Sequence, residues 1–272
     1  MKSNLSAAQA IPFYQVDAFA SEAFAGNPAA VCLLENWPDD DTLQRIACEN
    51  NLSETAFVLK QGNDFALRWF TPAVEVDLCG HATLAAAFVL FHRGDNTGDS
   101  IHFHTRSGEL IVTRQGELLA MDFPRTELEP LVAPPAGLLP ALGIDEETAL
   151  ECWKAFDYVV VIKDENKLDA LSPDFAALKK INTRGVVVTV SAEKVDFRSR
   201  WFGPQVGVNE DPVTGSAHTF LAPLWAKKLG KSTLYAQQGG KRKGELQCAI
   251  KEDGRVTLAG KAQLIIEGLF LL

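Results

Sequence analysis

The sequence predicts an α+β protein made of two similar halves. Short runs of strand-type alternation outnumber the helical segments, and turns containing glycine or proline separate them. The pattern Arg-Trp-Phe-x-Pro occurs at 68–72 and again at 200–204. Each copy leads through an acidic stretch into a Gly-polar-Ala triplet and an apolar helical segment. Two copies so far apart along the chain predict two similar domains, each containing a curled sheet.

The first half is predicted to contain two helices and several strands. Segment 39–51 begins with three aspartates and places apolar residues at helical spacing, and segment 82–92 is rich in small apolar residues. Alternating or β-branched runs predict strands at 11–20, 29–35, 52–59, 65–70 and 100–123. The last of these ranges is interrupted by Ser-Gly and Gln-Gly pairs, which is typical of an antiparallel meander.

Four prolines within 124–135 mark the predicted domain boundary, which separates a domain of residues 1–122 from one of residues 123–272. In the second domain, helices are predicted at 138–153, from an N-cap at Ser172, and at 215–230. Strands are predicted at 158–163, 185–192 and 197–202, and short strands finish the chain. The final strand is a candidate to pack back on the first domain.

Composition excludes several classes of function. The chain has 272 residues and a formal net charge of −9, so it lacks the excess of basic residues that binding to nucleic acid requires. The basic cluster at 241–243 is interpreted as a solvated loop. Five widely spaced cysteines predict neither a disulfide framework nor a zinc finger. No secretory signal and no apolar run long enough for a membrane span is evident, which favours a cytoplasmic protein without a membrane partner.

The two helices that begin with glycine are candidate anion sites. A helix that starts at Gly80 or Gly215 presents unpaired N–H groups and a partial positive charge, and glycine lets a ligand approach the backbone closely. Such helix starts suit a carboxylate. Asp211, His81 and Ser216 lie beside these glycines in the sequence and would add polar groups. The predicted partner is therefore a small-molecule carboxylate.

Four segments carry a resemblance to a known family. They are "VDAFASEAFAGNPAAV", "NLSETAFV", "TPAVEVDLCGHATLAAA" and "EDPVTGSAHTFLAPLWA". Together they resemble the phenazine-biosynthesis isomerase (PhzF-like) family, from about residue 11 to the C-terminus. The resemblance implies the diaminopimelate-epimerase fold, with two pseudo-symmetric domains, each a curled, mostly antiparallel sheet around a central helix. It also implies an active site in the interdomain cleft, a cofactor-independent isomerase reaction, and a homodimer.

The resemblance implies a role for each candidate site residue. Glu54 of the "SET" motif would be the general acid/base. Residues that would bind or orient the substrate are His81, Asp211 and Ser216, together with the backbone amides of Gly80 and Gly215. A base that moves a proton works best with a pKa near the working pH. Because Glu54 is followed by apolar residues such as Phe57, burial is expected to raise its pKa.

The sequence also leaves other interpretations open. The related epimerases use one cysteine in each domain as a thiol pair. Cys79 matches the first of these cysteines, whereas the position of the second is expected to fall on Pro212. A proline has no acid/base group, which argues against racemisation through a thiol pair. A catalytically silent carboxylate-binding protein and an amino-acid epimerase using Cys79 are the alternatives. Glu54 could also be a solvated strand end, and Asp211 or Ser216 an ordinary helix-start residue. His102 and His104 share a strand face without a third ligand, so they are interpreted as surface residues and no metal site is predicted. That no cofactor is needed is implied by the resemblance.

Overall fold

The computed structural model describes residues 10–272, which divide into two compact units. Unit 1 contains 10–18, Pro28–Met121 and Lys261–Leu272, and unit 2 contains Phe19–Asn27 and Asp122–Gly260. The division after residue 121 lies next to the predicted boundary. Residues 19–27 nevertheless belong to unit 2 and residues 261–272 to unit 1, so a single boundary does not describe the chain. No helix within residues 10–272 has the length and hydropathy needed to span a bilayer.

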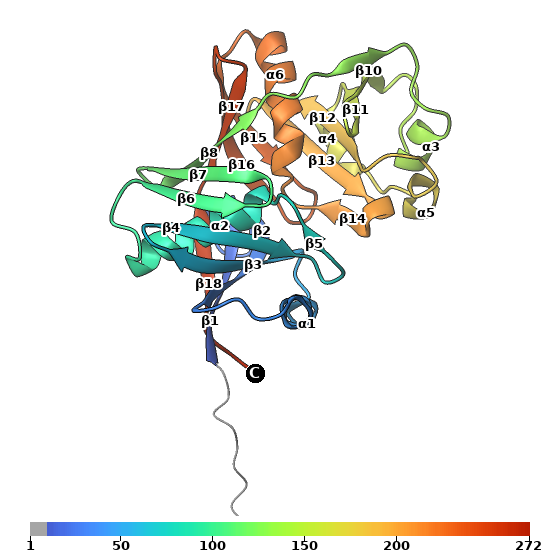
Figure 1. The fold of residues 1–272 in the computed structure, drawn as a ribbon. Helices are drawn as coiled ribbons and strands as arrows, with labels where there is room; N and C mark the ends of the chain where they lie inside the picture. The colour runs from blue at the N-terminus through green and yellow to red at the C-terminus, as the bar shows by residue number, and fades with distance from the viewer. Residues whose placement is uncertain (1–9) are drawn as a thin grey trace, which may run out of the picture. The chain divides into compact units, whose positions relative to one another are not determined.

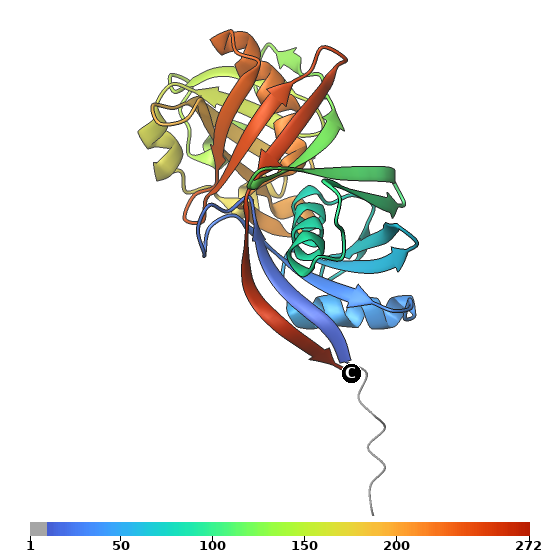
Figure 2. The same cartoon turned by 90° about the vertical axis from the view of Figure 1, so that its left-hand side faces the viewer.

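Unit 1 is a curled sheet around one buried helix (Figures 1 and 2). The helix, α2 (Gly80–Arg93), is buried along almost its whole length, as expected for a helix that is apolar on all sides. A second helix, α1 (Asp40–Asn50), buries one face. The strands follow one another across the sheet in the order β18 (Ala262–Leu271), β1 (Ala10–Ala18), β2 (Asn27–Leu34), β3 (Glu54–Gln61), β4 (Asp64–Phe70), β6 (Ser100–Thr105), β7 (Gly108–Gln115) and β8 (Leu118–Pro124).

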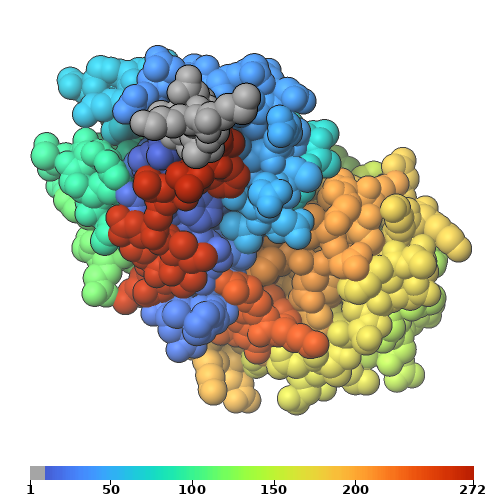
Figure 3. All heavy atoms as spheres, turned by 90° about the horizontal axis from the view of Figure 1, so that it is seen from below, coloured from blue at the N-terminus to red at the C-terminus, as the bar shows by residue number. Residues whose placement is uncertain are grey.

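Pairing in unit 1 is mostly antiparallel, with parallel pairs at β2–β3 and β4–β6. The short strand β5 (Glu75–Val76) pairs with β4 just before α2 begins. The last strand, β18, pairs with the first, β1, over the whole length of β1. These two strands lie side by side at the surface, where red and dark blue meet in Figure 3. Both ends of the described chain are thus part of unit 1.

Unit 2 has the same order of pairings around the buried helix α6 (Gly215–Leu229). Its strands follow in the order β9 (Glu129–Leu131), β10 (Ala149–Lys154), β11 (Tyr158–Ile162), β12 (Val186–Ser191), β13 (Phe197–Gly203), β15 (Thr233–Gln238), β16 (Gly244–Ile250) and β17 (Arg255–Gly260). Parallel pairs occur at β11–β12 and β13–β15, the counterparts of those in unit 1. The short strand β14 (Val208–Asp211) pairs with β13 before α6, as β5 pairs with β4 before α2.

The repeated arginine makes the same contact in both units. Arg68 donates from Nε and Nη2 to the carboxylate of Glu75, each at 2.7 Å. Arg200 donates in the same two-pronged way to Glu210, each at 2.8 Å. Both acids lie on the short strand that precedes the central helix. The predicted α+β class, with two similar halves that each surround a helix, is confirmed.

Two local predictions in unit 2 are wrong. The helix predicted at 138–153 is only α3 (Leu138–Leu142), because Gly143 takes a left-handed conformation that ends it, and residues 149–154 pair with β9 and β11 instead. The helix expected from Ser172 is α5 (Phe175–Leu178), whose N-cap is Asp174. A neighbouring short helix, α4 (Glu165–Ala170), is also capped by an aspartate.

Two glycines of unit 2 make room for the indole ring of Trp201. A Cβ added at Gly203 would lie 2.1 Å from this ring, and one added at Gly185 would lie 2.4 Å from it. Because the ring is buried and rigid, it cannot yield to an added methyl group. Gly203→Ala is therefore expected to lower the free energy of unfolding by about 1–3 kcal/mol, measured by urea denaturation.

The matched control for Gly203→Ala is Gly268→Ala. Gly268 has no atom within 4 Å of an added Cβ and no left-handed φ, so this change should have little effect on unfolding. Equal stability of the two variants would contradict the close packing described around Trp201.

Candidate active site

Unit 1 brings together Glu54, His81 and Cys79. Glu54 is the first residue of β3, where it pairs with Ala29 of the parallel neighbour β2. Cys79 is the extended N-cap residue of α2, and His81 is the second residue of that helix. His81 Nε2 lies 3.2 Å from Glu54 Oε2, and His81 Nδ1 lies 3.5 Å from Cys79 Sγ. The turn from β5 into α2 thereby places the imidazole between a carboxyl and a thiol.

Neighbouring backbone and hydroxyl groups contact the row formed by Glu54, His81 and Cys79. Ser53 Oγ lies 3.3 Å from His81 Nε2 and donates to the carbonyl of Pro28. The side chain of His81 is 7% exposed and that of Glu54 is 19% exposed, so the imidazole is the more enclosed group, although the Glu54 oxygen that faces it, Oε2, is also buried. The sequence predicted Glu54 and His81 as site residues, but gave no signal for Ser53 or for the contact with Cys79.

The charges of this row oppose the expected pKa shift of Glu54. Burial raises the pKa of the Glu54 carboxyl, but the positive charge and hydrogen bonds of His81, with smaller contributions from Ser53 and Cys79, outweigh it. The pKa of Glu54 therefore lies below its ordinary value, and the prediction of a raised pKa is wrong. Apolar residues follow Glu54 in sequence, yet its partner in space is a cation.

The pKa values of His81 and Cys79 shift in the directions that contact with a Glu54 carboxylate requires. Burial lowers the pKa of His81, but the interaction with Cys79 and then the negative charge of Glu54 outweigh burial and raise the pKa well above 6.5. Burial, followed by the charge of Glu54, raises the pKa of Cys79, so its thiol stays protonated at neutral pH. The resting site is thus a carboxylate–imidazolium pair beside a neutral thiol.

Glu54, Cys79 and His81 each offer one possible metal-ligand atom, and these three atoms lie within 4.8 Å of one another. Within residues 10–272 no other such group of three occurs. The donor types suit a zinc ion. However, the imidazole directs one nitrogen to the carboxyl and the other to the thiol, whereas one metal ion binds only one imidazole nitrogen. The hydrogen bonds of His81 run to Ser53 and Cys79, while Glu54 Oε2 lies at ion-pair distance, an arrangement of acid/base groups suited to moving a proton.

The counterpart of Cys79 in unit 2 is Thr214. Cys79 is the N-cap residue of α2, and Thr214 is the N-cap residue of α6, each directly before the glycine that opens its helix. The prediction that Pro212 occupies this place is wrong, because the three extra residues of the second copy lie before position 212. The Thr214 hydroxyl donates to Asp211 Oδ2 at 2.5 Å. A hydroxyl does not ionise near neutral pH, so this position offers no second thiol base.

Asp211 is the centre of a hydrogen-bond network in unit 2. It is the last residue of β14, and its Oδ1 accepts from Asn27 Nδ2 at 2.7 Å. Gln238 Nε2 donates to the Asp211 carbonyl at 2.9 Å and to the Thr214 hydroxyl at 2.9 Å. These contacts hold the segment 19–27 and the start of α6 together.

At the start of α6, Ser216 contacts Arg184, an arginine from the loop before β12 that the sequence did not single out. Both α2 and α6 begin at the predicted glycines, and neither N-cap side chain makes a capping hydrogen bond. Ser216 Oγ accepts a hydrogen bond from Arg184 Nη1 at 3.0 Å. His218, two residues on, is fully buried, and its Nδ1 lies 3.0 Å from the Thr214 carbonyl.

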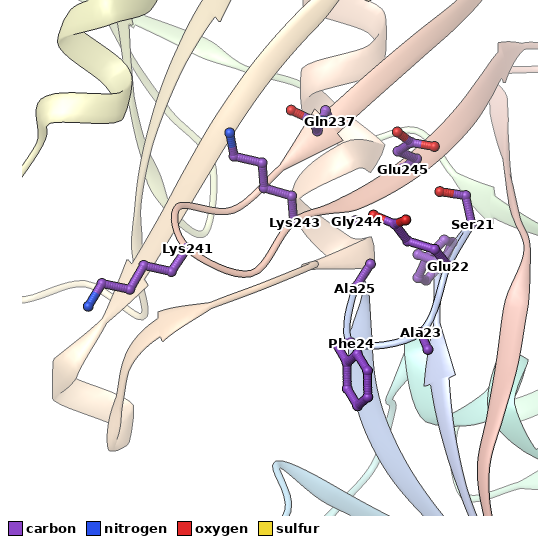
Figure 4. A pocket seen from close by; sticks show the side chains of 11 residues that line it. Ser21, Glu22, Ala23, Phe24, Ala25, Gln237, Lys241, Lys243, Gly244 and Glu245 are labelled. Atoms are coloured by element: carbon purple, nitrogen blue, oxygen red, sulfur yellow. The ribbon is translucent and has the colours of Figure 1, made fainter.

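A separate cavity of about 340 Å³ lies in unit 2 (Figure 4). It is lined by residues of the segment 19–25 and by Gln237, Lys241, Lys243, Gly244 and Glu245. None of the predicted site residues lines it. Its basic segment is not merely solvated, because Arg242 donates to the carbonyls of Gly26 and Ala25, at 2.7 and 2.8 Å. Arg242 thereby anchors the end of the segment that forms one wall of the cavity.

Comparison with known proteins gives one consistent result. Residues 16–268 match the PhzC-PhzF family, described as phenazine biosynthesis-like protein. A Pseudomonas aeruginosa protein named as an isomerase is 59% identical over 258 residues, which cover 95% of this chain and 98% of that protein. The crystal structure of a PhzF-family protein from Enterococcus faecalis has a TM-score of 0.93 at 47% identity, covering 97% of this chain and 100% of that one.

A structure with much lower sequence identity has a similar fold. A hydroxyproline epimerase from Agrobacterium vitis has a TM-score of 0.61 at 10% identity, covering 97% of this chain and 93% of that one. At this identity the likeness concerns the fold alone. It agrees with the epimerase-type fold that the sequence predicted.

Proposed function

Because the chain belongs to the PhzC-PhzF family of phenazine biosynthesis-like isomerases, we propose that it moves a proton between two carbon atoms of a small carboxylate, with Glu54 as the acid/base. The observation that carries this proposal is the contact between Glu54 and His81, 3.2 Å apart at the start of α2. A partly exposed carboxylate that is ionised at neutral pH is able to accept a proton from a bound molecule.

The pair also provides a way to return the proton. Glu54 in its resting form is a carboxylate beside the His81 imidazolium. Once Glu54 has taken a proton from one carbon, the same residue is an acid and can deliver the proton to another carbon within reach. His81 remains a cation through both steps and stabilises the carboxylate before and after turnover. This cycle needs one carboxyl group and no cofactor.

Binding of the substrate carboxylate is the second part of the proposal. The roles proposed for Gly80, Gly215, Asp211 and Ser216 are to bind and orient the substrate. The glycines supply backbone amides at helix starts, where the helix dipole favours an anion. Donors of this kind also stabilise the negative charge that develops when a carbon acid loses its proton.

The function is tested by proton exchange in D2O. The protein is incubated with but-3-enoate and L-proline, two acids with a proton next to an activating group, and deuterium at carbon is followed by NMR. Uptake into but-3-enoate beyond the protein-free rate supports the proposal, whereas uptake into L-proline alone would support the amino-acid epimerase. The alternative, a silent carboxylate-binding protein, predicts thermal stabilisation by the acids without any uptake. We also propose that the protein assembles as a homodimer, and light scattering on the same sample measures its mass in solution.

The activity is expected to follow a bell-shaped pH profile. The acid limb lies below the ordinary Glu pKa of 4.5, where Glu54 becomes protonated, and the alkaline limb lies above 6.5, where His81 loses its proton. In His81→Asn the cation is gone while burial remains, so the pKa of Glu54 should rise and the acid limb should move to higher pH. The measurement is the pH dependence of kcat/KM. An unmoved acid limb would contradict the assigned ion pair.

A further inference from the structure

Arg184 is held by contacts that involve most of its guanidinium group. It lies in the loop before β12, and its Nε donates to Asp157 Oδ1 at 2.8 Å while Nη2 donates to Asp157 Oδ2. Asp157 is fully buried, and its Oδ2 also accepts from Trp201 Nε1 at 2.9 Å. The guanidinium lies 4.6 Å from the ring centre of Phe156. A two-pronged ion pair over an aromatic face leaves an arginine little freedom.

The backbone on both sides of Arg184 is fixed as well. Thr183 N–H donates to the side chain of Gln205 at 3.0 Å, and the Thr183 hydroxyl donates to the Gly185 carbonyl at 2.9 Å. The same carbonyl accepts from the N–H of Tyr158. The loop therefore presents Nη1 of Arg184 at a defined place, although the side chain is 37% exposed.

The contact between Arg184 and Ser216 fixes the direction of the Ser216 hydroxyl. A guanidinium only donates hydrogen bonds, so Ser216 Oγ must accept from Nη1, as the 3.0 Å distance indicates. The serine proton then points away from Arg184. Within the part of the chain that the structure describes, no acceptor for this proton is found. A charged donor on the oxygen also strengthens the hydroxyl as a donor.

We infer that Arg184 is a positioning residue that aims the Ser216 hydroxyl proton at a substrate carboxylate bound at the start of α6. This inference rests on the proposed function, in which Ser216 binds the substrate carboxylate. The buried Asp157 holds Arg184 in place, and Trp201, seated between Gly185 and Gly203, holds Asp157. The chain from Trp201 through Asp157 and Arg184 to Ser216 thus sets the preference of the enzyme for acids over neutral molecules of the same shape.

The test is a double-mutant cycle on ligand binding. The probes are benzoate, but-3-enoate and L-proline, each compared with its amide, and affinities are measured by calorimetry. Arg184→Lys keeps a positive charge for Asp157 but loses the fork that also reaches Ser216. We expect it to weaken binding of the acids roughly tenfold, the effect of one hydrogen bond with a charged donor, and to leave the amides unchanged. In a Ser216→Ala background, the same change should have no further effect.

The control is Arg255→Lys, because Arg255 is 40% exposed and is paired with Asp122 in the same unit. It should not change the affinity for any probe. If the effects of Arg184→Lys and Ser216→Ala add, or if acids and amides weaken together, Arg184 does not act through Ser216 and the inference is overturned. Deuterium uptake that depends on Glu54 would then still support the proposed function. If the wild-type protein binds acids no better than amides, the carboxylate role of Ser216 is overturned together with the inference.

Discussion

Glu54→Gln should reduce deuterium incorporation by about two to four orders of magnitude, the range expected when a general base is lost. Glutamine has the shape of glutamate and can still accept a hydrogen bond from His81, but it cannot take a proton from carbon. The side chain of Glu54 is 19% exposed, so the substitution should not disturb the packing of β3. The measurement is the rate of exchange into an acid that the wild-type protein labels, at equal protein concentration.

Two control variants show whether the loss of exchange is specific to Glu54. Glu75→Gln removes another carboxylate of unit 1, one that is 12% exposed and paired with Arg68, and it should cost stability without removing exchange. Cys79→Ser should retain exchange, because the thiol is protonated and its counterpart Thr214 is not an acid/base group. Uptake that survives Glu54→Gln but is lost in Cys79→Ser would instead identify a thiol-dependent epimerase.

The protein should lose about 3 kcal/mol of stability between pH 6.5 and pH 4 through His218 alone. Burial lowers the pKa of His218 from 6.5 to about 4, and the hydrogen bond with the Thr214 carbonyl offsets only part of this. In the unfolded chain the residue takes up a proton near 6.5. Stability from this source is therefore complete above pH 6.5 and falls as the pH drops towards 4. The buried Nε2 has no hydrogen-bond partner among residues 10–272, so a proton there would be unsupported.

The prediction for His218 is measured as the difference between two unfolding profiles. Free energies of unfolding in urea are determined from pH 7.5 to pH 4 for the wild-type protein and for His218→Asn, whose amide can still donate to the carbonyl of Thr214. Carboxyl groups that titrate in this range contribute equally to both, so the difference isolates the histidine. His102→Asn is the control, because His102 is 40% exposed. Parallel profiles for the wild type and His218→Asn would show that His218 is not buried as a neutral group.

The sequence predicted the parts of the fold that its internal repeat encodes. Arg68 and Arg200 head two copies of one pattern, and their identical contacts with Glu75 and Glu210 follow from it. Position 149–154 was harder, because its residues are compatible with a helix and become a strand through pairing with β9 and β11. Such pairing is decided by segments elsewhere in the chain, which local patterns do not contain.

The contacts within the candidate site were also beyond prediction from local sequence patterns. Glu54 was identified from a motif, but the direction of its pKa depends on His81, which comes 27 positions later and meets it only after β3 and α2 have formed. Arg184 has no motif at all. Its partners Asp157 and Ser216 are 27 and 32 residues away, and neither contact has a counterpart in the first copy of the repeat that would have drawn attention to it.

The pairing of β1 with β18 has a consequence for biosynthesis. A ribosome makes the chain from its N-terminus onwards, so β1 is made long before its partner on one side, residues 262–271. Until residues 262–271 have been made, that edge of β1 is open to any other nascent strand. Unit 2 lies entirely before residue 261, and all of its segments have been synthesised by then. Unit 1 can therefore close only after the segments of unit 2 have been made, and loss of β18 would leave it unable to complete its sheet.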